Sequence, residues 1–416
     1  MTLATIWSWL FVALTWILAL GWLRQLLMWL GNSSRVADLT HAGAAPLRAS
    51  ATPFCTPAKP DLAVIVPACN EEASIAATLR SLLASQGLSV QIIAVNDRSS
   101  DRTGEIMAAE FQNFNHPKLN ENLQNSLQIL HIEALPEGWL GKPHALAKAA
   151  ELTQADWVLF TDGDVLFDPK ALALTLRYAQ AEQADHLVLM PDWIMASPGE
   201  AAMHGAMHAL STWTLHLWRV ADPQARDFLG VGAFNLVRRE VYETLGGFAA
   251  LRMEVLEDLR FGWQLKRAGY RQRVVLGPGL AAVRWSQGAW GVVRNLEKNL
   301  FALYRFKTGM ALFACLGLVV QIAVPLAAIW IGGWARLGAI VLYASIIGLY
   351  VASRRVTRVS PWYVLAYPLA VTLFLFAHVR SVGLALWRDG ILWRGTLYPL
   401  KELRAHAGHF WSSRAE

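Results

Sequence analysis

The chain has 416 residues, of which 55% are hydrophobic and only 16% are charged, so it is longer than one typical domain and too apolar for an ordinary soluble enzyme. Its net charge of +6 suits an anionic lipid surface or a negatively charged substrate. Because no zinc-finger spacing, helix-turn-helix pattern or aromatic RNA-binding motif accompanies that charge, the sequence argues against nucleic acid as a partner.

The first apolar segment predicts a membrane anchor within residues 1–30. Residues 3–23 carry no charge, and about 20 apolar helical residues span the hydrocarbon core of a bilayer. A cleaved signal peptide is the alternative, but the segment has no basic leader and a long apolar stretch. Arg24 and Arg35 follow it, so the positive-inside tendency places the chain after residue 24 in the cytosol.

A linker and then an α/β domain are expected after the anchor. Residues 31–60 are rich in Gly, Ser, Ala and Pro without an apolar period, as in a linker. From 61 to 285, short β-branched runs such as LAVIVPA and ADWVLFTD alternate with helical stretches, which predicts a largely parallel sheet. The three cysteines, Cys55, Cys69 and Cys315, are odd in number and widely spaced, which predicts neither a disulfide framework nor a metal cage and fits a reducing compartment.

Three further membrane segments are expected within residues 309–380, followed by a basic tail at 381–416. The three apolar runs are each near or above the spanning length. The charges conflict, however. One basic cluster, at 354–358, follows the second run, and another, from 380 to 404, follows the third. Three full spans cannot place both clusters inside, so either one segment is re-entrant or split, or the tail is exported.

Polar residues follow the first two predicted strands. Asn70 and Glu71 come directly after the first strand and before a helix, where ligand groups meet a strand end and a helix N-terminus. The alternative is that Asn70 caps that helix and Glu71 complements its dipole. Asn96 and Asp97 end the second strand, and this repetition favours a binding site at the sheet edge.

The third predicted strand ends in Asp162-Gly163-Asp164, which is the most informative motif. Two carboxylates that flank a glycine can bind one hard cation such as Mg²⁺ or Mn²⁺, which bridges them to substrate phosphates. A plain turn is the alternative. Lys142 lies in a glycine-flanked turn before it, where its ammonium is expected to reach a phosphate, or else to be solvated.

Further candidates lie later in the chain. Gly232 allows a sugar or acceptor to approach the backbone closely, with a plain loop as the alternative. Trp193 and His204 are candidates for the acceptor side, although packing is the commoner role for such residues. Residues 286–308, with Trp290 on an apolar face and Arg294 on a basic face, predict an amphipathic helix on the membrane surface, or alternatively a core helix under the sheet.

Five motifs appear in the order found in family 2 glycosyltransferases of the GT-A fold, and the chain resembles that family over about residues 61–300. They are PACNEE, VNDRSSDRT, GWLGKPHAL, FTDGDV and LEDLRFGWQLKRAGYR. Within the family the chain looks most like the hopene-associated glycosyltransferase (HpnB-like) group, through its anchor, GWLGKPHAL and the tail ILWRGTLY. The resemblance implies a Rossmann-like nucleotide-diphospho-sugar transferase domain between terminal transmembrane helices.

The resemblance also implies roles for individual residues. Pro67, Glu71 and Asp97 would line the nucleotide pocket, and Asp162 and Asp164 would contact donor and metal. Asn96 stands where many relatives have an aspartate. The usual Gln-x-x-Arg-Trp motif is rearranged here into Arg284-Trp285 with Gln287, Trp290 and Arg294 after it.

Asp258, in Leu-Glu-Asp-Leu, would be the general base that takes the proton of an acceptor hydroxyl, which implies inversion at the anomeric carbon. The alternative is that Glu257 and Asp258 merely begin a helix. The predicted catalytic residues are therefore Asp258 and Glu257. The predicted substrate-binding residues are Pro67, Asn70, Glu71, Asn96, Asp97, Lys142, Asp162, Asp164, Gly232, Trp290 and Arg294, and the predicted metal ligands are Asp162 and Asp164.

The sequence thus predicts an inverting glycosyltransferase of the bacterial inner membrane whose catalytic domain faces the cytosol. We expect a nucleotide-diphosphate sugar, and specifically a uridine diphosphate sugar, as donor. The expected acceptor is a lipid hydroxyl, of hopanoid or sphingolipid type if the resemblance holds. The alternatives are a polysaccharide synthase, a polyprenyl-phosphate glycosyltransferase, and a non-catalytic membrane scaffold or transporter.

Overall fold

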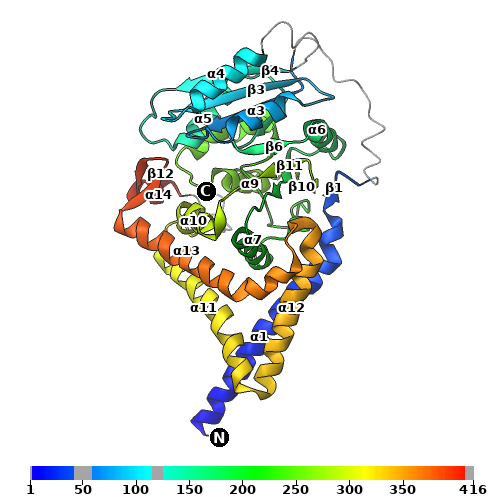
Figure 1. Ribbon diagram of the computed structural model, residues 1–416, viewed down its shortest axis with the longest axis vertical. Coiled ribbons are helices and arrows are strands. Elements are labelled where there is room, and N and C mark those ends of the chain that lie inside the picture. Colours follow the sequence, from blue (N-terminus) through cyan, green and yellow to red (C-terminus); the bar gives the residue numbers. More distant parts are fainter. Residues whose placement is uncertain (1, 42–58, 115–124, 408–416) are drawn as a thin grey trace.

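The computed structural model describes residues 2–41, 59–114 and 125–407, and it shows an α/β domain above a group of long apolar helices (Figure 1). Most of the predicted linker, Cys55 and the end of the tail lie outside these residues. In the described part of the linker, residues 31 and 32 end helix α1 (Leu3–Asn32), and strand β1 (Ala37–Asp38) joins the main sheet. Cys69 and Cys315 are free thiols.

The main sheet has eight strands in the order β1-β10-β7-β9-β5-β2-β3-β4. It is parallel except for β9, which is antiparallel to both β5 and β7. The fold is therefore a mixed α/β sheet, close to the largely parallel one expected. The strands after β1 are β2 (Leu62–Ala68), β3 (Val90–Asp97), β4 (Ser126–Ile132), β5 (Trp157–Phe160), β7 (His186–Met190), β9 (Asn235–Arg238) and β10 (Gln272–Leu276).

Helices cover both faces of this sheet, as the fully apolar strand β2 requires. Successive residues of β2 show this, because Val64 packs in the core with α3, α4 and α6, whereas Ile65 packs in the core with α5, α8 and α9. The first group of helices is α3 (Ile75–Leu83), α4 (Thr103–Phe114) and α6 (Ala171–Ala181). The second group is α5 (Gly141–Ala150), α8 (Arg239–Thr244) and α9 (Glu257–Arg267).

A small second sheet and two helices lie between the main sheet and the membrane-type helices. The second sheet contains β6 (Val165–Phe167), β11 (Ala281–Val283) and β8 (Asp192–Trp193). Helix α7 (Pro198–Ser211) follows it and begins with a capping box, in which Ser197 and Glu200 bind each other's backbone N–H groups. Helix α10 (Gly288–Leu303) occupies most of the predicted amphipathic segment and buries Val292, Val293 and Leu296.

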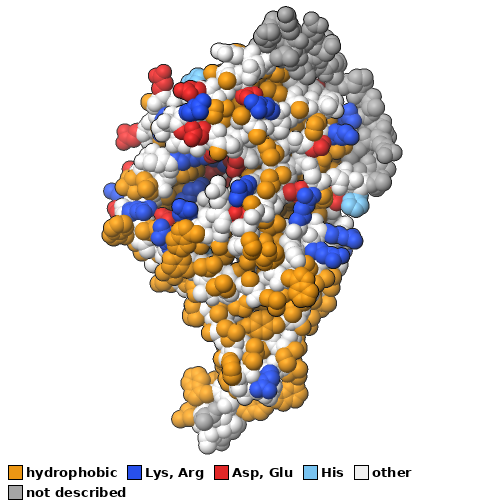
Figure 2. Space-filling model, in the orientation of Figure 1, with side chains coloured by type: hydrophobic (Ala, Val, Ile, Leu, Met, Phe, Trp, Pro, Cys, Tyr) orange, Lys and Arg blue, Asp and Glu red, His pale blue; other side chains and the backbone are white. Residues whose placement is uncertain are grey.

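Within the described ranges, four helices are long and apolar enough to cross a membrane, and one of them lies near the N-terminus, as expected. These are α1, α11 (Thr308–Ile331), α12 (Gly333–Thr357) and α13 (Tyr367–Trp387), the last preceded by a 3₁₀ turn at Pro361–Ala366. Helices α1, α11 and α12 converge on the narrow tip of the molecule, whereas α13 runs across their upper ends (Figure 1). Figure 2 shows hydrophobic side chains over this tapering part and charged ones over the α/β domain.

The predicted basic tail is described by the structure as far as residue 407. It forms an antiparallel hairpin of β12 (Gly390–Trp393) and β13 (Thr396–Pro399), followed by α14 (Leu400–His406). Ile391, Tyr398 and Leu403 of this unit are buried in one cluster with Leu140, the residue before α5. The tail is thus packed against the α/β domain rather than separate from it.

Candidate active site

The Asp162-Gly163-Asp164 motif follows β5 directly and is held in place by its neighbours. Thr161 donates from its backbone N–H to the carbonyl of Ile65 and from its hydroxyl to the carbonyl of Ala233. A side chain at Gly163 would approach Ala68 Cβ at 3.3 Å and the Pro67 carbonyl at 3.4 Å. The glycine therefore lets the motif lie close against the end of β2, and Pro67 contributes through its backbone.

Lys142 lies between the acidic groups of the site. It is the second residue of α5 rather than part of a turn, so the expected turn is wrong there. Its Nζ lies 2.7 Å from Asp162 Oδ1 and 2.7 Å from Glu257 Oε1. Burial disfavours its charged form, but these two carboxylates outweigh burial and raise the pKa of Lys142 above its ordinary value. The ammonium is thus held between two carboxylates in the wall of the site, and its role in binding a phosphate stays a prediction.

Glu257 and Asp258 begin helix α9, as the helix-start alternative predicted, but they also face the site. Glu257 is buried and paired with Lys142. Asp258 accepts hydrogen bonds from the backbone N–H of Gly232 at 2.7 Å and from its neighbour Leu259 at 2.7 Å. Burial and the nearby Glu257 raise the pKa of Asp258 to about 6. This carboxyl group therefore has the proton affinity that suits a general base near neutral pH.

Gly232 lies between Asp162 of the Asp-Gly-Asp motif and Asp258 of helix α9. Its N–H binds Asp258, and a side chain there would lie only 2.7 Å from Asp162 Oδ2 and 3.0 Å from Lys142 Nζ. The backbone at this position thus fills the space between the Asp-Gly-Asp motif and the helix α9 carboxylates. The prediction that a glycine is needed here for close approach agrees with this geometry, although the approaching group is the protein's own.

Asp164 is the carboxylate best placed to receive a cation. Burial, Asp162 and Glu71 together raise the pKa of Asp164 to about 7, because the negative charges repel one another. In contrast, the pKa of Asp162 is lowered, since Lys142 outweighs its burial. Within the described ranges, no three Asp, Glu, His or Cys side chains converge as a complete metal cage. Two carboxylates that need positive charge do fit a Mg²⁺ or Mn²⁺ ion whose other ligands are donor phosphates and water.

The residues that follow β2 and β3 bind each other. Asn70 has a left-handed backbone (φ +58°), and its side-chain oxygen accepts from the N–H of Ser100 at 2.8 Å, so it holds the loop after β3 rather than capping α3. Asp97 is buried, with both oxygens bound to Arg98 at 2.8 and 3.1 Å. Asn96 binds the ring of His131 at 3.2 Å. These contacts shape the edge of the sheet beside the site.

The remaining candidates pack with aromatic neighbours. Trp193 and His204 stack with ring centroids 4.3 Å apart, and Trp285 lies against both, so the packing alternative describes them. Burial lowers the pKa of His204 to about 4, which leaves it neutral. Trp290 packs against Phe376 of α13, with ring centroids 5.7 Å apart.

A pocket of about 540 Å³ opens between the α/β domain and the C-terminal elements, a size typical of ligand sites. Four of the predicted residues on the domain side line it, namely Glu71, Lys142, Asp162 and Asp164, and Arg294 lines it from α10. Asp258 and Gly232 instead border a small cavity behind Lys142. The opposite wall comes from α10, α13 and the β12–β13 hairpin.

That opposite wall contains basic residues that the sequence did not single out. They are Lys298, Arg388 and Arg394. Arg394 Nη2 reaches Glu71 Oε1 at 2.8 Å, although 323 positions separate the two residues. The segment ILWRGTLY carried a signal, because two short apolar runs around Arg-Gly are typical of a hairpin. Sequence reasoning used it only as a point of family likeness.

Comparison with known proteins agrees with this architecture. Residues 63–259 match the family model for glycosyl transferase family 2. These residues form a glycosyl transferase family 2 domain. The match ends just after Glu257 and Asp258, so it includes the acidic residues of the site.

The relatives share part of their length with the chain. A 4,4'-diaponeurosporenoate glycosyltransferase of Staphylococcus haemolyticus is 25% identical over 58% of this chain and 60% of its own length. One of the same name from Staphylococcus aureus is 20% identical over 48% of this chain and 50% of its own. The chain thus spans half to three-fifths of the length of these relatives.

Solved structures also match the chain at low sequence identity. One of them is the mannosyltransferase PcManGT from Pyrobaculum calidifontis in complex with GDP-Man and Mn²⁺, with 17% identity, a TM-score of 0.49, and coverage of 89% of this chain and 98% of that one. The predicted family and the predicted α/β fold with terminal apolar helices are confirmed. The hopene-associated subgroup and the roles of single residues stay predictions.

Proposed function

We propose that this chain is a membrane-associated glycosyltransferase that moves a sugar from a nucleoside diphosphate sugar to the hydroxyl of a lipid, with inversion at the anomeric carbon. The observation that carries the proposal is the arrangement around Gly232. A carboxyl group of raised pKa, Asp258, lies directly behind the Asp-Gly-Asp motif, inside a domain of a sugar-transferring family. Such a pairing provides a base for the acceptor and an anionic site for the donor's cation.

In the proposed reaction Asp258 takes the proton of the acceptor hydroxyl while that oxygen attacks the anomeric carbon and the nucleoside diphosphate leaves. The Gly232 and Leu259 N–H groups hold the carboxylate in one orientation before the substrate arrives. Lys142 keeps Asp162 and Glu257 charged and in place. Pre-organised groups of this kind reduce the reorganisation that the transition state would otherwise require.

A divalent cation supports the donor side of this proposal. Asp164, with Asp162 beside it, would hold Mg²⁺ or Mn²⁺, which would neutralise charge on the departing diphosphate. Glu71 lies in the same pocket, and its pKa is raised by burial although Arg394 opposes that shift. The donor is a nucleoside diphosphate sugar, with a uridine base as our first expectation.

The membrane side of the molecule supports a lipid acceptor. The pocket lies between the α/β domain and α13, which is the apolar helix nearest to that domain (Figure 1). A lipid that remains in the bilayer can therefore present a hydroxyl to the pocket from below. The related proteins named as diaponeurosporenoate glycosyltransferases are consistent with a lipid-like acceptor. A hopanoid or sphingolipid-like acceptor, the bacterial inner membrane and its cytosolic face are the finer parts of the proposal.

The variant Asp258→Asn tests the proposal. It keeps the hydrogen-bond acceptor for Gly232 but removes the base, so transfer should fall by about 10²- to 10⁴-fold while donor affinity changes little. Purified protein in lipid would be incubated with radiolabelled nucleotide sugars and host lipid extract, and the product identified by mass spectrometry. Unchanged turnover in Asp258→Asn would refute the base and would favour a phosphate acceptor, as in a polyprenyl-phosphate glycosyltransferase. A long-chain glycan product would instead indicate a polysaccharide synthase, and no transfer from any donor a scaffold or transporter.

A further inference from the structure

Opposite charges line the two walls of the candidate pocket. The domain side contributes the carboxylates Glu71, Asp162 and Asp164. Lys142 is already bound between two carboxylates, and a single divalent cation would leave a nucleoside diphosphate facing excess negative charge. The donor therefore needs further cations from outside the family 2 domain, and the wall formed by α10, α13 and the hairpin is where the chain provides them.

Two of the cations on that wall are available to a ligand. Arg388 is engaged with Glu297 at 3.1 Å, on the same wall. Lys298, in contrast, lies over the ring of Trp393 at 4.0 Å, and no hydrogen-bond acceptor contacts its Nζ among the residues that the structure describes. Arg394 binds Glu71, a residue of the donor side, and its side chain is 38% exposed. Arg394 thus reaches the acidic wall, and Lys298, in the part of the chain that the structure describes, contacts the ring of Trp393 on its own wall without an ion pair there.

The hairpin carries Arg394 at its turn, and its Trp393 lies against Lys298 of helix α10. Arg394 and Gly395 form its turn with left-handed backbones (φ +49° and +81°), so the chain reverses there without a longer loop. Gly141 directly precedes Lys142, and its backbone N–H donates a hydrogen bond to the hydroxyl of Tyr398 at 3.4 Å. The hairpin is therefore fixed against the start of α5, at the mouth of the pocket.

We propose that the β12–β13 hairpin completes the donor site, with Arg394 and Lys298 binding the diphosphate of the nucleotide sugar. This proposal rests on the proposed glycosyltransferase function. Glu71 holds Arg394 in position before the donor binds, and the diphosphate then replaces Glu71 as its partner. Burial lowers the pKa of Lys298 to about 8, and an adjacent diphosphate would favour its charged form. The rearranged Gln-x-x-Arg-Trp region is thus supplemented by a segment about 100 residues further along the chain.

The test measures binding of UDP, GDP and the free nucleosides to the full-length protein in detergent with Mn²⁺. Arg394→Gln and Lys298→Met should each weaken UDP or GDP binding by about 10- to 100-fold, as expected for loss of a charge-assisted hydrogen bond, and should leave nucleoside binding unchanged. Arg394→Lys and Lys298→Arg should retain most of the affinity. The matched control is Lys401→Gln, an exposed basic residue of α14 in the same C-terminal segment that is not among the residues lining the pocket, and it should change affinity by less than about 3-fold.

The outcomes separate this proposal from the function on which it rests. Normal diphosphate affinity in Arg394→Gln and Lys298→Met, with transfer intact in the wild type, would overturn the hairpin's role alone. Equal losses in Lys401→Gln would also overturn it, because the effect would then come from general positive charge. If the wild type bound no nucleoside diphosphate, the glycosyltransferase proposal itself would fail.

The two ends of α13 carry an independent inference about the membrane. Before the helix, Arg358 binds Asp192 of strand β8 at 2.9 Å. After it, the hairpin reaches Glu71 through Arg394. Between these points α13 lies along α10, where Ser381 accepts a hydrogen bond from the Phe301 N–H at 3.0 Å. A helix of 21 residues is about 31 Å long and could cross a bilayer, but both of its ends lie on one domain.

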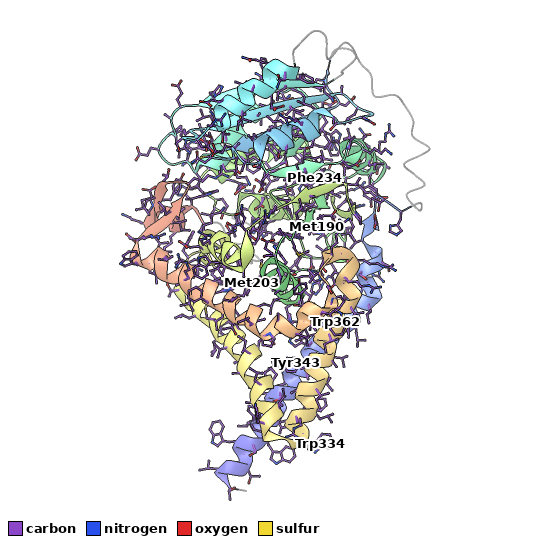
Figure 3. The ribbon with its side chains drawn as sticks, in the orientation of Figure 1. Met190, Met203, Phe234, Trp334, Tyr343 and Trp362 are labelled. Carbon is purple, nitrogen blue, oxygen red and sulfur yellow. The ribbon has the colours of Figure 1, made fainter. Side chains whose placement is uncertain are left out.

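The outer face of α13 is apolar, whereas the opposite face is buried on the protein. Its exposed side chains recur every three or four residues, which places them on one stripe: Leu369, Thr372, Phe376, Val379, Gly383 and Leu386. Exposed tryptophans mark both of its ends, at Trp362 and Trp387, close to the α/β domain. Trp334 marks the opposite end of α12, at the tip of the molecule (Figure 3). Tryptophan at two levels is typical of the two interfaces of a bilayer.

We infer that α13 lies in the plane of the interface and that, of the four candidate helices, only α1, α11 and α12 cross the bilayer. This path removes the charge conflict in the sequence, because the basic cluster before α13 and the one after it then share the side of the α/β domain. It also makes the interfacial helix a wall of the pocket, through Ser381, Leu384 and Arg388.

Cysteine labelling with a membrane-impermeant maleimide tests this path in the full chain, with the three native cysteines replaced by alanine. Ser360→Cys and Lys401→Cys, before and after α13, should label from the same side as Glu105→Cys in the α/β domain. Trp334→Cys, at the tip, should label from the other side. Labelling of Ser360→Cys and Lys401→Cys from opposite sides would show that α13 crosses and would refute the inference.

Discussion

Lys142 offers a quantitative test of the site, because one ammonium binds two carboxylates of unequal exposure. The Glu257 side chain is 5% exposed and that of Asp162 is 37% exposed, so Lys142→Met leaves mainly Glu257 as an uncompensated buried charge. Breaking a buried pair costs about 3–5 kcal/mol, and we expect the lower end, about 3 kcal/mol, since Asp162 can be solvated. At about 2–4 °C per kcal/mol, the melting temperature should fall by about 6–12 °C.

The assay is thermal unfolding of purified protein in detergent, followed by tryptophan fluorescence at one scan rate for all variants. Glu257→Gln removes the charge that Lys142→Met would strand, so the double variant should recover part of the loss, with a coupling of about 2 kcal/mol. Additive losses, or a Lys142→Met protein as stable as the wild type, would refute the ion-pair reasoning. The pH dependence of transfer is a second readout. Lys142 lowers the pKa of Asp258, so Lys142→Met should shift the acidic limb of the pH–activity profile to higher pH.

Three further outcomes are expected. In the wild type, transfer should decline as pH falls through about 6, because a base must be deprotonated and burial raises the pKa of Asp258 to about 6; a rate that stays constant down to pH 5 would contradict the base. Chelation, or Asp164→Ala, should abolish metal-dependent donor binding measured by calorimetry, and metal-independent binding would count against the cation site. Gly232→Ala should reduce transfer at least tenfold without unfolding the protein, because its methyl group would displace Asp162 or Lys142; normal kinetics would show that this space is not needed.

The parts of the fold that could be predicted depend on local sequence. Strands β2, β3 and β5 were visible as short β-branched runs because strands buried on both faces are continuously apolar. Their ends could be assigned to one edge because parallel strands align their carboxyl ends. Strand β9 was not foreseen as an antiparallel member of the sheet, since its four residues carry no information about which strands flank them.

The candidate site was only partly predictable for a related reason. Residue type and position at the strand ends indicate Asp162, Asp164 and Glu71 as candidates, and the family resemblance adds Asp258 as the general base. The identity of the residue with which each side chain forms an ion pair or hydrogen bond has no such local signature. Nothing in the sequence near Lys142 shows that Glu257 lies 2.7 Å away, or that Asp97 binds Arg98 through both oxygens. Binding a phosphate is the role that its local sequence suggests for Lys142, and only the tertiary structure adds its two ion pairs.

The position of the C-terminal segment at the pocket also depends on tertiary contacts that its local sequence does not show. In the sequence, its basic residues conflict with three full membrane spans, and its ILWRGTLY run is a point of family likeness. Because α13 runs across the upper ends of α1, α11 and α12, the tail returns to the α/β domain, and Arg394 meets Glu71 at the pocket. A donor that binds there would contact the family 2 domain on one side and an interfacial unit on the other. Binding of the nucleotide sugar and access of a lipid acceptor would then both depend on the contact between the family 2 domain and the unit formed by α10, α13 and the hairpin. A family 2 domain without these C-terminal elements does not contain that contact.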